Sequence, residues 1–202
     1  MINSHYIITL ATFAFASSIT PGANNLMLMT SGVHFGLRQT LPHMFGVAFG
    51  FMAMMVLVGL GLGELFKLYP ILLVVLKYLG AIYIIWLAYK ITQTKAIDNL
   101  AKITTKPMRF LAAVAFQWVN PKAWMMGIYA ITAFTVPEHY SSSIMVVSLI
   151  FGTINLPCIT CWTLFGVAMR RFLNNETVMR RFNYIMAALL IASLWPVFMN
   201  IT

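Results

Sequence analysis

Six stretches of this chain are long and apolar enough to cross a lipid bilayer, and no other feature constrains its fold as strongly. A spanning helix needs about 20 largely apolar residues. Only 8% of the residues are charged, against about 25% in a typical soluble domain. We therefore predict an all-α integral membrane protein whose 202 residues form a single transmembrane domain. The predicted spans are residues 6–30, 41–63, 70–89, 110–134, 142–168 and 183–200.

The connections between these spans differ strongly in positive charge. Lys67 and Lys77 belong to one side of the membrane, and Lys122 falls inside a span. The other ten basic residues follow the first, third and fifth spans: Arg38, Lys90, Lys95, Lys102, Lys106, Arg109, Arg170, Arg171, Arg180 and Arg181. Because basic loops stay in the cytoplasm, both termini are predicted outside it. We therefore attribute the net charge of +9 to the orientation of the protein in the membrane. The sequence contains no stripe of Lys and Arg that would bind nucleic acid.

Six spans with both termini on one side divide into two halves of three, and the second half is then inverted. Inverted repeats are typical of secondary transporters, whose substrate sites lie near the midplane where helices are interrupted. Pro21 in the first span and Pro121 in the fourth are at corresponding interruptions. We predict that helices 1 and 4 are broken and that the substrate site lies between them.

The fourth span contains "AFQWVNPKAW", with Pro121 about a dozen residues, or roughly 18 Å, from Arg109. Proline interrupts a helix, and Asn120 before it is biased away from helical geometry and can cap the helix that follows. Lys122 is then a cation near the midplane, and no Asp or Glu lies inside a span. This predicts that an anionic group such as a carboxylate arrives with the substrate. The alternative is that Lys122 snorkels to the interface or is neutral.

The first span contains "TPGANN", in which Pro21 and Gly22 break the helix. Asn24 or Asn25 can satisfy the backbone groups that the break frees. The N–H groups that begin the next helix suit a carboxylate, and amide oxygens accept hydrogen bonds from an ammonium group. These groups and Lys122 together suit a zwitterion. The alternative is a simple proline kink that neighbouring helices satisfy.

Two further polar side chains lie inside spans. Gln117 comes one turn before Pro121, and Asn155 lies near Pro157 in the fifth span. Hydrogen bonding between helices is the alternative role for both. With them, the predicted substrate-binding residues are Pro21, Gly22, Asn24, Asn25, Gln117, Asn120, Pro121, Lys122 and Asn155.

These motifs resemble the lysine exporter (LysE/RhtB-type) amino-acid translocator superfamily. "TPGANN" is similar to its T-P-G-P-N signature, except that Ala23 stands where the family usually has proline. "FLAAVAFQWVNPKAW" is similar to its Asn-Pro-Lys motif, and "YLGAIYIIWLAYKI" to its third helix. The resemblance implies a bacterial inner-membrane exporter of small amino acids or derivatives, driven by the proton motive force. Within the superfamily, the chain looks most similar to the cysteine and O-acetylserine exporters.

Proton coupling usually employs an Asp, Glu or His inside the membrane, and here no acid lies in mid-span. His43 and Lys122 are the titratable candidates, and neither fits the role of a dedicated proton carrier. From the sequence we expect coupling to run through Lys122 or through the charge of the substrate itself.

Two other classes of protein would place different residues inside the spans. An ion or metal efflux protein or channel of the same architecture would need carboxylates or His/Cys clusters inside the spans. An intramembrane enzyme would need a nucleophile beside a His or Asp. The sequence has neither, so no catalytic residue, cofactor or metal is predicted. Cys158 and Cys161 would supply only half of the ligands of a zinc site, and we predict that they serve helix packing. The expected partners are an amino acid and the lipid bilayer, with a homo-oligomer left open.

Overall fold

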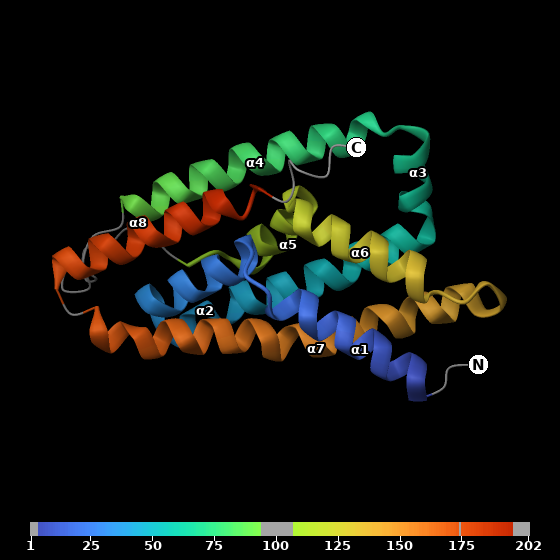
Figure 1. Ribbon diagram of the computed structural model, residues 1–202, viewed down its shortest axis with the longest axis horizontal. Helices are drawn as coiled ribbons and strands as arrows, with labels where there is room; N and C mark the ends of the chain where they lie inside the picture. Colours follow the sequence, from blue (N-terminus) through green and yellow to red (C-terminus); the bar gives the residue numbers. More distant parts are fainter. Residues whose placement is uncertain (1–3, 94–106, 174, 196–202) are drawn as a thin grey trace.

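The computed structural model describes residues 4–93, 107–173 and 175–195, and every regular element within them is helical (Figure 1). This confirms the all-α class. The helices are α1 (Ser4–Ile19), α2 (Ala23–Leu57), α3 (Gly63–Leu68), α4 (Ile71–Thr92), α5 (Phe110–Val119), α6 (Pro121–Phe134), α7 (Tyr140–Met169) and α8 (Glu176–Ala192). A π-helical turn (Val58–Leu62) joins α2 to α3, and short 3-10 turns (Pro137–His139 and Arg170–Phe172) flank α7.

Three helical segments are long and apolar enough to cross a membrane. They are Ala23–Leu65, Val74–Thr92 and Pro137–Phe172. Two shorter helices, Ser4–Ile19 and Phe110–Val119, are also apolar. The structure therefore agrees with a multi-pass membrane protein, while the number of six passes stays a prediction.

Helix α2 reverses direction at Gly36, and here the structure differs from the sequence-based prediction. The predicted spans left residues 31–40 as a connection between two helices, but these residues are helical apart from Gly36, whose φ of 75° favours glycine. In Figure 1 the blue half of α2 runs to the left-hand end, and the cyan half runs back to the right. Thr40 donates a hydrogen bond to the Gly36 carbonyl at 2.8 Å and lies 2.9 Å from Ser31 Oγ, so one side chain ties the two halves together.

Glycines let α2 pack closely against α7 on one side and α5 on the other. A Cβ at Gly32 would overlap the Thr163 carbonyl of α7. On the opposite half of α2, a Cβ at Gly46 would lie 2.5 Å from the Phe110 carbonyl oxygen, and one at Gly50 would lie 2.8 Å from the same helix, α5. Small residues at helix contacts are typical of membrane proteins, where backbones approach closely. The close packing holds α1, α2, α5 and α7 around the interrupted region.

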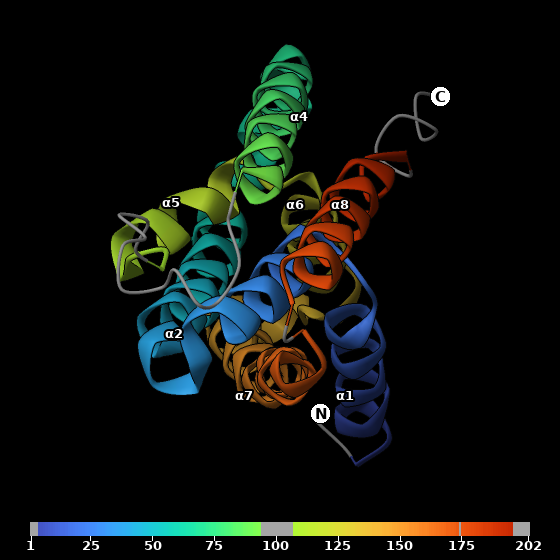
Figure 2. The same ribbon diagram turned by 90° about the vertical axis from the view of Figure 1, so that its left-hand side faces the viewer.

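Helices α4 and α8 lie side by side along one edge of the molecule (Figures 1 and 2). Their apolar contacts include Ile84 and Ala88 of α4, and Met186 and Leu190 of α8, which belong to one buried cluster. The opposite face of α4 exposes large apolar side chains, as expected of a helix that faces lipid. Gly80 brings α4 against the Val119 carbonyl, where α5 ends.

Candidate substrate site

The chain leaves helical geometry at two places that pack against each other. Helix α1 ends at Ile19 and α2 begins at Ala23, with Gly22 in an extended conformation (φ −173°, ψ 174°). Helix α5 ends at Val119, and α6 begins directly at Pro121. Proline has no N–H to donate and is favoured at the first position of a helix, which accounts for the start of α6 at Pro121. Pro21 lies two residues before α2, where its missing N–H cannot continue α1.

Asn120 separates α5 from α6 and caps the second of them. Its backbone is extended (φ −88°, ψ 105°), as the residue before a proline prefers. Its side-chain Oδ1 accepts a hydrogen bond from the Lys122 backbone N–H at 3.2 Å, so one free N–H of α6 is satisfied.

The Lys122 ammonium joins the two interruptions. It donates hydrogen bonds to the Thr20 carbonyl at 2.8 Å, to Thr20 Oγ1 at 2.9 Å and to the Pro21 carbonyl at 3.4 Å. The carbonyls at the end of a helix carry partial negative charge, so this is a favourable place for a cation. Gly22 leaves room for the contact, because a Cβ there would lie 2.8 Å from Lys122 Cδ. Lys122 is therefore turned inward toward the end of α1.

Asn25 satisfies the backbone that the first interruption frees. Its Nδ2 donates to the carbonyls of Ser18 and Thr20, both at 2.8 Å. Asn25 is 4% exposed and Ser18 is 3% exposed, so this side chain supplies a hydrogen-bond donor to a carbonyl in a buried region, as buried backbone groups require. The structure thus gives Asn25 the backbone role that the sequence allowed to either Asn24 or Asn25.

Asn24 and Gln117 form a reciprocal amide pair between α2 and α5. Asn24 Nδ2 donates to Gln117 Oε1 at 2.9 Å, and Gln117 Nε2 donates to Asn24 Oδ1 at 3.2 Å. Gln117 is fully buried and also donates to the Ala113 carbonyl at 3.0 Å. Interhelical hydrogen bonding, the alternative role for Gln117, is therefore present in this conformation.

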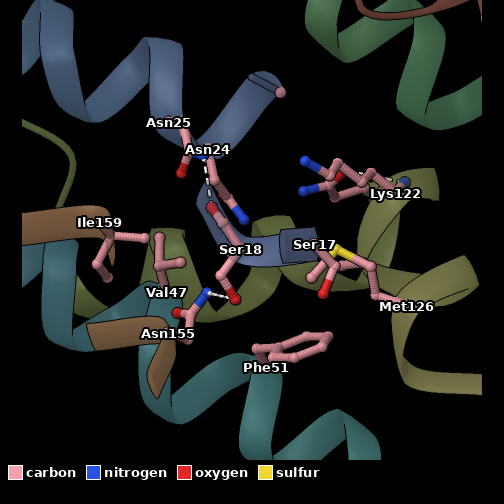
Figure 3. Close-up of a pocket in the computed structure, with 13 residues that line it drawn as sticks. Ser17, Ser18, Asn24, Asn25, Val47, Phe51, Lys122, Met126, Asn155 and Ile159 are labelled. Carbon is pink, nitrogen blue, oxygen red and sulfur yellow. Dashed lines mark hydrogen bonds between the residues drawn. The ribbon is translucent and has the colours of Figure 1, made fainter. Parts of the chain in front are cut away.

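Asn155 reaches the same region from α7. Its Nδ2 donates to Ser18 Oγ at 3.1 Å, while its buried Oδ1 has no hydrogen-bond partner among the described residues. Figure 3 shows Asn155 beside Ser18, with Val47 and Ile159 next to them. A buried acceptor without a partner is costly unless a ligand or water supplies a donor. Asn155 Oδ1 is therefore open to a donor group from outside the protein.

These residues enclose a small polar cavity of about 30 Å³ (Figure 3). Its polar lining includes Ser17, Ser18, Asn24, Asn25, Lys122 and Asn155. Val47 and Phe51 of α2 contribute apolar walls. A volume of this size holds one or two water molecules, so the cavity is closed to an amino acid in this conformation.

A second cavity, of about 350 Å³, lies on the other side of Lys122. Thr20, Pro21 and Pro121 line it together with Ile84 of α4 and Ser193 after α8. Residues shared by both cavities are Gly22, Asn120, Lys122 and Met126. The Lys122 side chain thus borders both a small cavity and a larger one.

The structure brings all nine predicted site residues into this region. Six line the small cavity: Gly22, Asn24, Asn25, Asn120, Lys122 and Asn155. Pro21 and Pro121 line the larger cavity, and Gln117 reaches the site through Asn24. Ser18 and Thr20 were not predicted from the sequence, although the hydroxyl-rich run immediately before Pro21 was a signal for them.

No carboxylate lines either cavity within the described part of the chain. The three described acids, Glu64, Glu138 and Glu176, each lie in the first turn of a helix, and Asp98 is outside the described residues. The same part of the chain contains no group of three or more His, Cys, Asp or Glu residues that could hold a metal ion. Cys158 is buried and Cys161 exposed, and neither forms a disulfide.

Comparison with known proteins identifies the family of this chain. A family model described as LysE type translocator matches residues 15–193. The chain is 30% identical over 181 residues to the cysteine/O-acetylserine efflux protein of Salmonella paratyphi A, covering 89% of this chain and 91% of the relative. It is 31% identical, with the same coverage, to the protein of that name from Escherichia coli O1:K1 / APEC. No solved structure matches. The chain therefore belongs to the LysE-type translocator family, as its motifs predicted, and is a membrane transporter rather than an enzyme.

Proposed function

We propose that this chain exports small polar amino acids or close derivatives from the cytoplasm, as a secondary-active exporter driven by the proton motive force. The observation that carries the proposal is Lys122, a cation that joins two interruptions beside a polar cavity with no carboxylate in its described lining. Such a cation suits a substrate that brings its own carboxylate. The printed names of the relatives make cysteine and O-acetylserine the first substrates to test.

The two charges of an amino acid have separate partners at this site. The carboxylate would bind the Lys122 ammonium and the first N–H groups of α2, whose N-cap Gly22 offers no side-chain cap. The ammonium group would donate to Asn155 Oδ1, the buried acceptor that lacks a partner among the described residues. This arrangement supports recognition of the zwitterion and leaves a small side chain against Val47 and Phe51.

Transport requires the small cavity to open, because about 30 Å³ admits water and not an amino acid. Lys122 borders both cavities, so movement of its ammonium away from Thr20 would join them. We propose that the structure corresponds to a closed state and that substrate entry separates α6 from the end of α1.

We further propose six membrane passes arranged as two inverted halves, each with one interrupted helix. The first pass would consist of α1 and the first half of α2, and the fourth of α5 and α6. The end of α4, the end of α7 and the start of α8 lie together at the left-hand end of Figure 1. Their basic residues, Lys90, Arg170, Arg171, Arg180 and Arg181, support a cytoplasmic location for this end.

Reporter fusions test this orientation. A periplasm-active reporter joined after Thr202 should be active, and a cytoplasm-active reporter at the same position should be silent. The reverse pattern is expected for fusions after Arg171, at the basic end. A C-terminal fusion that is active only in the cytoplasm would contradict the six-pass arrangement.

Export itself is tested with purified protein in proteoliposomes. Vesicles are loaded with labelled cysteine, O-acetylserine, leucine or lysine, and efflux is measured with and without a pH gradient. We expect gradient-stimulated efflux of the first two substrates that a protonophore abolishes. Protein-dependent efflux of none of the four, from vesicles containing correctly inserted protein, would contradict the proposal.

Asn155→Ala should weaken substrate binding without abolishing transport. The substitution removes the proposed acceptor for the substrate ammonium, and a hydrogen bond to a charged group contributes about 1.5–3 kcal/mol. We expect the KM for efflux to rise roughly tenfold or more, with a smaller change in maximal rate. Ser148→Ala is the matched control, because Ser148 is also buried on α7 without a described hydrogen-bond partner. An unchanged KM in Asn155→Ala would remove Asn155 from the site.

A further inference from the structure

A third cavity, of about 290 Å³, lies between the two halves of α2 and the end of α4. Thr30, Ser31 and His34 line it from the first half of α2, and His43 from the second half. Trp86 and Lys90 line it from α4. Lys90 belongs to the basic end of the molecule, so under the proposed orientation this cavity lies toward the cytoplasm.

His43 is the unusual residue of this cavity. The side chain is 2% exposed, and neither Nδ1 nor Nε2 has a hydrogen-bond partner among the described residues. A neutral imidazole carries one donor and one acceptor, and burying both without partners is costly. The cavity that His43 lines is large enough for several water molecules, and a water molecule there can be the hydrogen-bond partner that the described residues do not provide. An ionisable side chain kept inside a membrane at such a cost indicates a function.

The environment of His43 can be compared with that of His34, the other imidazole of the cavity. His34 Nε2 lies 3.2 Å from Asn183 Oδ1 of α8, and Arg170 at the end of α7 acts on it electrostatically. Among the described residues that line the cavity, the other charged group is Lys90, whose ammonium lies 5.6 Å from the Trp86 ring centroid. Helices α5 and α7 pack against this part of α2 with the apolar side chains of Ala113 and Ile159. His43 is therefore the imidazole of this cavity whose two buried nitrogens both lack a hydrogen-bond partner among the described residues, whereas His34 lacks one only at Nδ1.

One face of α2 connects His43 to the substrate site. His43, Val47 and Phe51 follow one another at intervals of four residues and so lie on the same side of the helix. His43 lines the third cavity, whereas Val47 and Phe51 line the small polar cavity. A spacing of four residues is about 6 Å along the helix axis. A change in α2 that opens one cavity will therefore alter the surroundings of the other.

We propose that His43 binds the proton that is exchanged for the exported amino acid, an inference that rests on the proposed function. A ring nitrogen of His43 takes up a proton from water on the outer side after the amino acid has left, and the imidazolium keeps it until the transporter opens to the cytoplasm. The proton then passes to water on that side, the neutral ring is restored, and the next amino acid binds. The sequence alone favoured Lys122 or the charge of the substrate as the coupling route. In the structure the Lys122 ammonium instead donates to three oxygens at the end of α1.

The test separates proton-driven transport from simple exchange in proteoliposomes whose membrane potential is clamped at zero. A difference of one pH unit can sustain about a tenfold substrate ratio if one proton exchanges for one substrate. In His43→Gln and His43→Asn we expect this ratio to fall to unity. Exchange of labelled for unlabelled substrate needs no net proton movement and should continue in both variants. His139→Gln, at an exposed histidine before α7, should behave as wild type.

Each outcome decides between the two proposals. Gradient-driven accumulation that persists in both His43 variants would overturn the role of His43. Loss of exchange in both variants, with the protein monodisperse and inserted, would assign the ring to translocation itself and also overturn it. If the wild-type protein transports none of the amino acids tested, the proposed function fails instead. Wild-type transport that ignores the pH gradient would reject proton coupling for this chain.

Discussion

Lys122→Met should reduce amino-acid efflux at least roughly 30-fold while leaving the protein folded and inserted. Truncating one partner of a buried charged contact costs about 2–5 kcal/mol in recognition, which corresponds to at least this factor. Methionine retains the apolar stem of lysine but cannot bind a carboxylate. The measurement is efflux of labelled substrate from proteoliposomes that contain equal amounts of inserted protein.

The structure explains why the fold should survive this substitution. The Thr20 carbonyl loses the Lys122 ammonium but still accepts a hydrogen bond from Asn25 Nδ2 at 2.8 Å. Removing a cation from the membrane interior also removes its cost of desolvation, and an apolar replacement of a buried charge is often neutral for stability. We therefore expect a melting temperature in detergent close to that of the wild type.

Lys77→Met is the matched control, because Lys77 lies in α4 and lines none of the cavities described above. It should transport at the wild-type rate. Full activity in Lys122→Met would show that the substrate carboxylate binds elsewhere. Equal losses in both lysine variants would point to the electrostatic potential of the whole molecule rather than to this site.

Residue types at the two interruptions made their positions predictable. Proline lacks an N–H and restricts the residue before it, so the end of α5 at Val119 and the start of α6 at Pro121 follow from "VNPK". The same reasoning applies to Pro21, between α1 and α2. These are local effects, and a local sequence is enough to anticipate them.

Contacts between distant segments were less predictable. From the sequence we expected Lys122 to have no partner in the protein and to bind a substrate carboxylate. In the structure its ammonium contacts the oxygens of Thr20 and Pro21, about 100 residues away in the chain. Backbone carbonyls are present at every residue, so no sequence pattern distinguishes the ones a lysine will reach. The reversal at Gly36 was not predictable either. A single glycine with positive φ can reverse the chain without a loop of polar residues around it.

Gly22→Ala should impair transport by displacing Lys122 rather than by unfolding the protein. The new Cβ would lie 2.8 Å from Lys122 Cδ and 3.2 Å from its Nζ, so the side chain must move. The backbone at Gly22 is extended, which alanine adopts freely, and the flexible lysine can yield at little cost in stability. Its ammonium would then leave the Thr20 oxygens, and a displacement of about 1 Å in a binding group can cost up to roughly 100-fold in rate.

We expect efflux by Gly22→Ala to fall roughly 10-fold to 100-fold at an almost unchanged melting temperature. Gly127→Ala in α6 is the matched control, because the nearest atom to its new Cβ is Met54 Cε, at an ordinary contact distance of 3.4 Å. If Gly22→Ala transports at the wild-type rate, the position of the Lys122 ammonium in the closed state does not limit transport. If the Gly22→Ala protein melts many degrees below the wild type, Gly22 is required for the stability of the fold. The three heavy atoms nearest to the added carbon all belong to Lys122. A selective loss of efflux would therefore show that Gly22, in the first interruption, acts on transport through Lys122, in the second.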